Sequence, residues 1–234
     1  MKSILNRFKF YAVGFIIGLI FVVFFFQNRG CSWLPSNRVK NTLLDKVLVL
    51  PDSEVEKIAS QNLNEADLIS FLEDGDINFR VSLKDHSTFP KVYVFEKEIH
   101  EELLRLQFSI FEDSYIAIIH FLGETEEPQR YQELDGFGNF IRIPRDTSLV
   151  YIDKSDYTQC KASNLNVADK DEIANLLKNN GRINFSKSNL LLPKAEHFIS
   201  YHENDTTTIN AKTIWFESRI TFKDFYWDET LPCE

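Results

Sequence analysis

The chain has 234 residues, of which 44% are hydrophobic, with only seven prolines and eight glycines, and this composition excludes a disordered protein. The first thirty positions hold Lys2, Arg7, Lys9 and Arg29 and no acidic residue, so the rest of the chain is more acidic than the net charge of -9 indicates. An acidic surface repels phosphate groups, which argues against nucleic-acid binding.

An apolar segment follows a basic N-terminal tail at residues 1–9. Residues 10–28 contain no charged side chain, and the run FYAVGFIIGLIFVVFFF covers about 25 Å as a helix, which predicts a transmembrane helix over 10–28. A cleaved signal peptide is the alternative, although the run ends in bulky residues where a signal peptidase needs small ones. Gly14 and Gly18 form a small-xxx-small pair through which two such helices could pack. The expected location is the bacterial inner membrane, with the remaining chain outside the cytoplasm.

A short segment occurs twice. GDINFRVS at residues 75–82 recurs as GRINFSKS at 181–188, which indicates an old duplication, with chance similarity as the alternative. Each copy follows an amphipathic stretch that predicts a helix, and Asn64 is the expected N-cap of the first. Each helix is expected to end at the glycine in a left-handed conformation. Alternating apolar and polar residues after each copy predict antiparallel strands.

The sequence therefore predicts an α+β protein, with an N-terminal transmembrane helix followed by two similar helix-plus-antiparallel-sheet units. The boundaries after the helix are expected as follows: a juxtamembrane segment at 29–50, repeat unit 1 at 51–122, a linker with a hairpin at 123–159, and repeat unit 2 at 160–234.

The residues directly after the apolar run, GCSWLPSNRV from Gly30 to Val39, resemble a segment shared by a group of uncharacterised bacterial single-pass membrane-anchored proteins. The resemblance extends to about residue 95 and implies a membrane anchor, a following helix and a Gly-Asp-Ile/Val-x-Phe turn like that at 75–79. It implies no activity, because none is known for that group.

Three cysteines, Cys31, Cys160 and Cys233, are too few for a disulfide framework and show no CxxC spacing. In an oxidising compartment, a Cys160–Cys233 disulfide would tie the start of the second unit to the C-terminus and stabilise it by about 2–4 kcal/mol. In a reducing compartment both would be small apolar residues.

Candidate chemistry is sparse. The acids around the glycine in Glu73–Asp76 look like part of a calcium loop, but the closing glutamate is missing and Arg182 stands at the matching place in the second copy. His197 and His202 point to opposite faces of a strand and are expected to be surface residues. His120 lies in an apolar run and is expected in the core or opposite a neighbouring strand. The sequence thus predicts no catalytic residue, no metal ligand and no cofactor.

The sequence supports two hypotheses about function. The consecutive aromatics at 225–227 leave at least one ring exposed, so Tyr226 and Trp227 are the expected partner contacts. The leading hypothesis is a membrane-anchored, non-enzymatic interaction or accessory protein, a subunit of a larger bacterial envelope complex. The alternative is an envelope ligand-binding sensor or enzyme with a site between the two units. A sensor or enzyme should show a concave pocket with converging polar groups and a perturbed titrating residue, whereas an accessory protein should show an exposed apolar patch or an open sheet edge.

Overall fold

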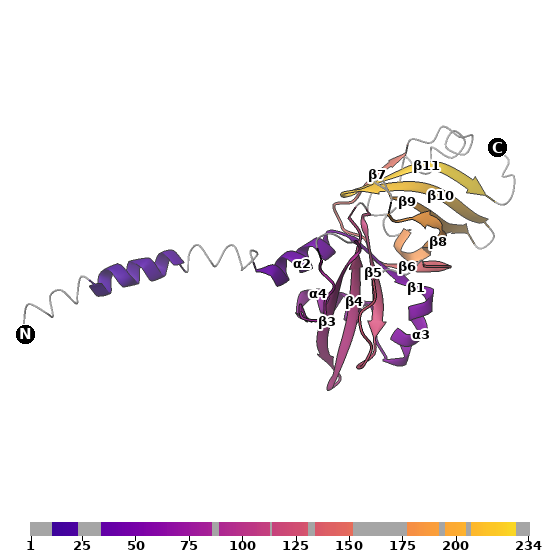
Figure 1. Ribbon diagram of the computed structural model, residues 1–234. Coiled ribbons are helices and arrows are strands. Elements are labelled where there is room, and N and C mark those ends of the chain that lie inside the picture. Colours follow the sequence, from indigo (N-terminus) through magenta and orange to yellow (C-terminus); the bar gives the residue numbers. More distant parts are fainter. Residues whose placement is uncertain are drawn as a thin grey trace, which may run out of the picture. The chain divides into compact units, whose positions relative to one another are not determined.

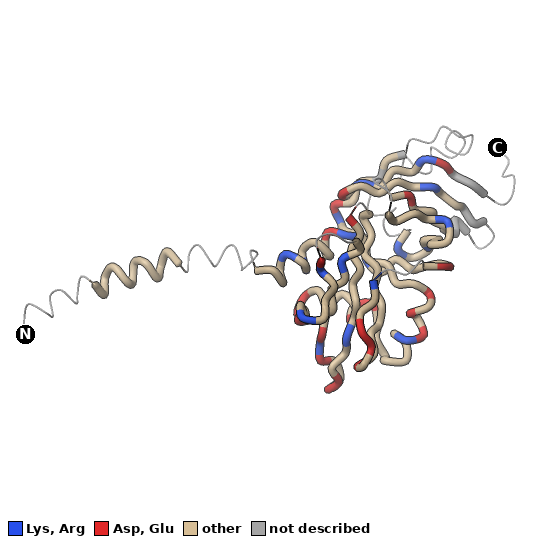
Figure 2. Tube along the Cα trace, in the orientation of Figure 1, with Lys and Arg blue, Asp and Glu red and all other residues tan. Residues whose placement is uncertain are grey.

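The computed structural model (Figure 1) describes residues 11–22, 34–85, 89–112, 114–130, 134–151, 177–191, 195–204 and 207–227. The chain forms two units, Met1–Asn41 and Thr42–Glu234. In the first unit, residues 11–22 form a helix without a charged side chain, which is tan throughout in Figure 2.

The prediction of a single-pass transmembrane helix over residues 10–28 is corrected by the structure. Within the part of the chain that the structure describes, no helix is both long enough and apolar enough to cross a membrane. The described part of this apolar segment, residues 11–22, rises about 18 Å as a helix, whereas the hydrocarbon core of a bilayer is about 30 Å thick.

One sheet dominates the second unit. The described residues form 11 hydrogen-bonded strands in the order β2-β3-β4-β5-β1-β6-β8-β9-β10-β11-β7. The strands are β1 (Val47–Pro51), β2 (Asp76–Ile77), β3 (Lys91–Ile99), β4 (Glu102–Ile110), β5 (Ile116–Leu122), β6 (Phe137–Arg142), β7 (Ser148–Tyr151), β8 (Gly181–Asn189), β9 (Glu196–Asn204), β10 (Thr207–Phe216) and β11 (Arg219–Trp227). The labelled helices are α2 (Pro35–Leu44), α3 (Asp52–Ser60) and α4 (Glu65–Glu73).

The prediction of an α+β protein with two similar helix-plus-antiparallel-sheet units is therefore wrong. The described helices are short, and β6, which lies in the expected linker, pairs with β1 on one side and with β8 on the other. Through β6, the strands before the expected linker are hydrogen-bonded to the strands after it. All the described strands therefore form one mixed sheet. The sheet is mixed because β1 runs parallel to β5, and β7 runs parallel to β11.

The repeated segment forms the same local structure at both places. At Ser82 and Ser188 the hydroxyl donates to the asparagine carbonyl four residues earlier, at 2.7 and 2.6 Å, and accepts an N–H from the next strand, at 3.1 and 3.0 Å. The strand order from β2 to β1 also matches the order from β8 to β7. The two halves of the sheet, β2 to β1 and β8 to β7, thus share their strand order and the serine hydrogen bonds of the repeated segment.

The N-terminus of helix α4 is capped as predicted, but the glycine at its C-terminus has a different role from the predicted one. The prediction of Asn64 as N-cap is confirmed, since its side chain accepts the N–H groups of Ala66 and Asp67 in a capping box. The expected left-handed glycine at the C-terminus is wrong, because Gly75 has no positive φ. A Cβ on Gly75 would lie 2.6 Å from the Phe71 carbonyl oxygen, so close approach is what requires glycine there.

One hydrophobic core cluster spans the two halves of the sheet. Phe140 of β6 packs against Trp215 of β10 with ring centroids 5.8 Å apart, and both rings are fully buried. Val49 and Phe185 belong to the same cluster. Burial of this apolar surface stabilises the sheet at the place where the halves meet.

A substitution at Gly138 tests the packing where the two halves of the sheet meet. A Cβ there would lie 2.6 Å from the Phe185 ring and 2.9 Å from Val49, so Gly138→Ala is expected to lower the unfolding free energy by about 1–3 kcal/mol. Urea unfolding gives this value. Gly123→Ala is the control, because its Cβ would meet nothing closer than 3.4 Å and its cost should be far smaller. Equal costs would contradict the packing at β6.

Candidate functional site

A pocket lies where two paired parallel strands, β1 and β5, end at different places along the sheet. β1 and β5 pair from Val47↔Ile116 to Val49↔Ile118. β1 then ends at Pro51, and the chain turns directly into α3, while β5 continues to Leu122. In open sheets with parallel strands, ligands often bind beyond the carboxyl ends of such strands. On its other side β1 pairs with β6, which is antiparallel to it.

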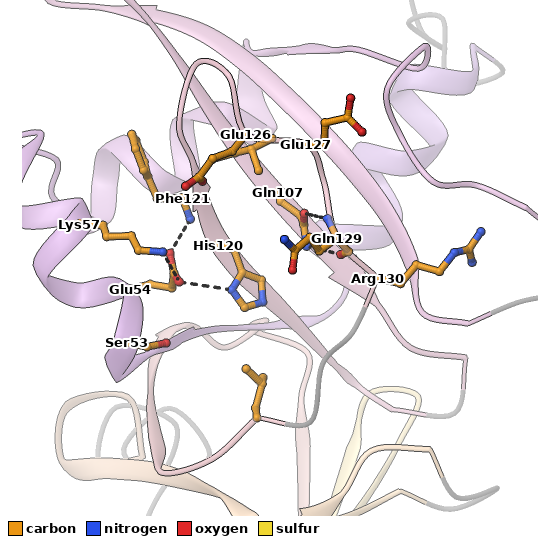
Figure 3. Close-up of a pocket in the computed structure, with 12 residues that line it drawn as sticks. Ser53, Glu54, Lys57, Gln107, His120, Phe121, Glu126, Glu127, Gln129 and Arg130 are labelled. Carbon is orange, nitrogen blue, oxygen red and sulfur yellow. Dashed lines mark hydrogen bonds and ion pairs between the residues drawn. The ribbon is translucent and has the colours of Figure 1, made fainter.

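Glu54, in the first turn of α3, lines the pocket. It is only 5% exposed. One carboxylate oxygen, Oε2, accepts the backbone N–H of Phe121 at 2.9 Å, and the other, Oε1, accepts from Lys57 Nζ at 3.1 Å. His120 Nδ1 lies 3.7 Å from the same Oε1 (Figure 3). The carboxylate thus links α3 to the end of β5, which lies beyond the residues that pair with β1.

Glu54 stays ionised in this buried place. Burial by itself would raise the pKa of the Glu54 carboxyl, but the contacts from His120, the Phe121 N–H and Lys57 outweigh it and lower the pKa to about 2. This buried carboxylate, with hydrogen bonds from Phe121 and Lys57 and an imidazole nearby, is therefore a negative charge at neutral pH.

His120 presents a nitrogen to the pocket. Its side chain is 24% exposed, and Nδ1 faces Glu54 while the other ring nitrogen is turned away from Glu54 (Figure 3). A carboxylate next to one imidazole nitrogen favours a hydrogen on that nitrogen. The second nitrogen, Nε2, is an acceptor in the neutral ring that carries this hydrogen and a donor in the protonated ring.

The opposite wall is a loop held by two side chains of β4. Arg105 Nη1 donates to the carbonyls of Gly123 and Glu124 at 3.0 and 2.8 Å. The buried amide of Gln107 donates to the Gln129 carbonyl at 2.9 Å and accepts the Gln129 N–H at 3.0 Å. This wall is fixed before any ligand binds, because each contact involves the backbone of the loop.

The pocket has a volume of about 380 Å³, near the lower end for small-molecule sites. Its lining residues are Ser53, Glu54, Lys57, Gln107, His120, Phe121, Leu122, Glu126, Glu127, Gln129, Arg130 and Leu134. Polar groups predominate, and three short apolar surfaces, from Phe121, Leu122 and Leu134, interrupt them.

The residues expected to contact a partner lie elsewhere. Tyr226 and Trp227 are in β11, opposite Asn210 and Ile209 of β10, and the structure does not describe their side chains. Their role stays a prediction. Gly14 and Gly18 lie in the helix over 11–22, where an added Cβ would meet no atom within 4 Å, and their packing role also stays a prediction.

Cys160 and Cys233 lie outside the described residues, so the possible disulfide between them stays a prediction. Among the residues that are described, no group of three or more His, Cys, Asp or Glu side chains could hold a metal ion.

His197 was expected at the surface and is instead fully buried. Its Nε2 lies 2.9 Å from Ser114 Oγ, and its ring stacks on Trp215 with centroids 4.4 Å apart. The Thr213 hydroxyl donates to the His197 carbonyl at 3.0 Å. Burial, opposed by a hydrogen bond with Ala195, lowers the pKa of His197 to about 3. This site is closed to solvent and is a structural link between the two halves of the sheet.

Glu54, Lys57 and His120 were missed as site residues. Glu54 and Lys57 are an i,i+3 pair of opposite charge, a pattern that normally indicates an exposed helix face. His120 was expected in the core or opposite a residue of a neighbouring strand, and it does lie opposite Gln107 of β4. The one available signal was a histidine within a buried apolar strand, which needs a polar partner.

Comparisons with protein-family models, with curated proteins and with solved structures find no match for this chain. The fold and the pocket therefore define its class by themselves: a mixed-sheet protein with a preformed polar pocket at the carboxyl end of β1.

Proposed function

We propose that the protein binds one small polar molecule in the pocket between α3, β5 and the loop at 123–130. This is the ligand-binding alternative of the two functions that the sequence left open, with the site within one half of the sheet instead of between two units. The observation that carries the proposal is a concave surface lined mainly by polar side chains, among them Lys57 and His120, both of which lie beside the buried, ionised Glu54.

The pocket has the features of a recognition site and not of a packing defect. A defect would be lined by apolar atoms and would be closed by small movements of side chains. Here the wall is anchored by Gln107 and Arg105, and Glu54 is buried although an ionised carboxylate is costly to remove from water. Such costs are commonly retained where a protein binds a ligand.

The interaction hypothesis has less support from the described surface. The exposed large apolar side chains of the second unit belong to four different places in the chain: Val55, Leu103, Leu191 and Phe216. Single exposed apolar residues are ordinary on soluble surfaces and do not by themselves indicate a partner.

The test is thermal unfolding of the full-length chain with a panel of small sugars, carboxylic acids, amines and phosphates. A ligand of the pocket, added at about 100 times its dissociation constant, should raise the Tm by about 5–10 °C, because it binds only the folded state. Ser53→Tyr should abolish the shift, since Ser53 lines the pocket and a larger side chain there fills it.

Ser60→Tyr is the matched control, because Ser60 is also exposed on α3 but does not line the pocket. It should retain the full shift. A ligand that still stabilises Ser53→Tyr would contradict the proposal, as would a complete panel without any effect on the wild-type protein.

A further inference from the structure

We infer that the outer edge of β2 binds an extended segment of another protein, which adds a strand antiparallel to β2. The inference goes beyond the proposed function, because it concerns a protein partner and a different surface. A groove along this edge shares no lining residue with the pocket at Glu54. The groove is lined by Asp76, Ile77, Asn78, Phe79, Arg80 and Glu96.

The second copy of the repeated segment already carries such a strand. Residues 182–184 of β8 pair with β9 on one side and with residues 137–139 of β6, antiparallel, on the other. Residues 76–78 hold the matching positions in the first copy and bond to β3. In the part of the chain that the structure describes, no strand lies on their other side, so β2 ends the sheet. An uncovered strand edge presents backbone groups that pair readily with another chain.

The apolar side chains of the two copies differ in burial accordingly. Ile183 and Phe185 are 0% and 4% exposed, and a Cβ on Gly138 of β6 would lie 2.6 Å from the Phe185 ring. Ile77 and Phe79, at the matching positions, are only half-buried. A docked strand with a small residue at the place of Gly138 would cover both side chains, and burial of their apolar surface favours binding.

One backbone donor also distinguishes the two edges. In the second copy the Phe185 N–H donates to the Gly136 carbonyl, just before β6, at 2.8 Å. In the first copy the Phe79 N–H donates to the Ile77 carbonyl, only two residues earlier, at 3.1 Å. Such an i→i+2 bond is a γ-turn, which is common at strand ends. A docked strand would offer Phe79 a carbonyl at the place that Gly136 holds in the second copy.

Arg80 favours an acidic residue at the start of the docked strand. Its counterpart in the second copy, Ser186, accepts the Gly136 N–H at 2.9 Å, and its Oγ lies 3.5 Å from a carboxylate oxygen of Asp135. Arg80 is exposed and lines the groove. A guanidinium group in place of the serine hydroxyl strengthens the attraction for a carboxylate at this position.

Asp76 favours a basic residue farther along the docked strand. Its counterpart, Arg182, lies opposite Asn139 of β6. Asp76 is exposed and lies opposite Glu96 of β3, a second carboxylate of the groove. The expected partner segment therefore reads acidic-x-x-small-basic, in the direction antiparallel to β2, since a parallel strand would need the two charges in the reverse order.

Two peptides with exchanged charges test the inference. DGFGKFI has the sequence of residues 135–141 with the change Asn139→Lys, and KGFGDFI has its two charges exchanged. Fluorescence anisotropy with the full-length protein gives a dissociation constant for each peptide. DGFGKFI is expected to bind, and KGFGDFI to bind about tenfold more weakly, because each of its charges meets a like charge.

A third peptide tests whether binding adds a strand. Gly138 lies opposite Ile183 in the second copy, so the second glycine of DGFGKFI is expected opposite Ile77. N-methylglycine at this position removes the backbone donor and should abolish binding.

Charge reversal on the protein provides the matched variant. The double variant Asp76→Lys, Arg80→Glu should bind KGFGDFI more tightly than DGFGKFI. Glu102→Lys, Arg145→Glu makes the same charge changes at exposed residues outside the groove and should keep the wild-type preference.

The inference is overturned if DGFGKFI does not bind the wild-type protein, if the two charged peptides bind equally, or if the preference is unchanged in Asp76→Lys, Arg80→Glu. Sedimentation tests another occupant of the edge. A wild-type dimer that this variant loses would assign the edge to a second copy of the chain and also overturn the inference. None of these results bears on the pocket at Glu54, which is tested with other ligands and variants.

Discussion

Lowering the pH from 6.5 to 4.5 is expected to cost the folded protein about 2 kcal/mol of unfolding free energy through His197 alone. The pKa of His197 falls from 6.5 in the unfolded chain to about 3 in the folded protein. Below pH 6.5 the unfolded chain therefore binds a proton that the folded protein excludes. The stability is fully present above pH 6.5 and declines by about 1.4 kcal/mol per pH unit below it.

The surroundings of His197 explain why it stays neutral. Its ring is enclosed by Trp215, its Nε2 lies against the hydroxyl of Ser114, and the ammonium group of Lys46 acts against protonation. Lys46 itself is held in place by the Ser114 carbonyl at 2.6 Å. A second positive charge at this place would have neither water nor a carboxylate to stabilise it.

Urea unfolding at pH values between 6.5 and 4.5 measures this effect. His197→Gln keeps a hydrogen-bonding side chain and cannot titrate, so its unfolding free energy should decline less steeply than that of the wild type. His100→Asn, which replaces an exposed histidine, should retain the wild-type slope. Equal slopes for the wild type and His197→Gln would show that His197 is not the titrating group.

Glu54→Ala is expected to lower the unfolding free energy by about 2–4 kcal/mol and to abolish ligand binding. The change removes the acceptor of the Phe121 N–H and leaves Lys57 without its carboxylate at the pocket wall. Glu56→Ala, on the exposed side of α3, should cost no more than about 0.5 kcal/mol. A similar small cost for Glu54→Ala would contradict the assigned role.

The pH dependence of Glu54 has its own window. Its pKa is lowered from 4.5 to about 2, so the unfolded chain takes up a proton first as the pH falls. The stabilisation by the ionised carboxylate is present above pH 4.5 and is lost between pH 4.5 and 2. Glu54→Gln should lack this loss, while the decline between pH 6.5 and 4.5 should remain.

The local elements were more predictable than their assembly. The N-cap at Asn64 was readable because capping depends on a few adjacent residues. The strand β1 was missed because Val47–Pro51 is buried along its whole length and shows no alternation, and the expected juxtamembrane segment covered it. The single sheet could not be predicted, since the pairing of β6 with β1 and β8 joins residues far apart in sequence.

The pocket could not be predicted either, because it forms only when these strands are paired. Glu54 and His120 are 66 positions apart and meet only because β1 lies beside β5 and leads into α3. Gln107 could not be recognised as an anchor of the loop before the loop was placed against β4. A single charged residue on a short helix carries no signal of burial, and the contacts with His120, Phe121 and Lys57 that lower the pKa of Glu54 exist only in the assembled fold.

Amide chemical-shift mapping of the full-length protein, titrated with the ligand that gives the largest Tm shift, tests the central claim most directly. Binding in the pocket should move the amide signals of Ser53, Phe121 and Gln129, because these residues line it and Phe121 and Gln129 hold its walls through their backbone N–H groups. The signals of Ile199 and Thr213, in the core of the other half, should stay in place. Shifts that gather on β9 and β10, with Phe121 and Gln129 unmoved, would contradict the proposed site.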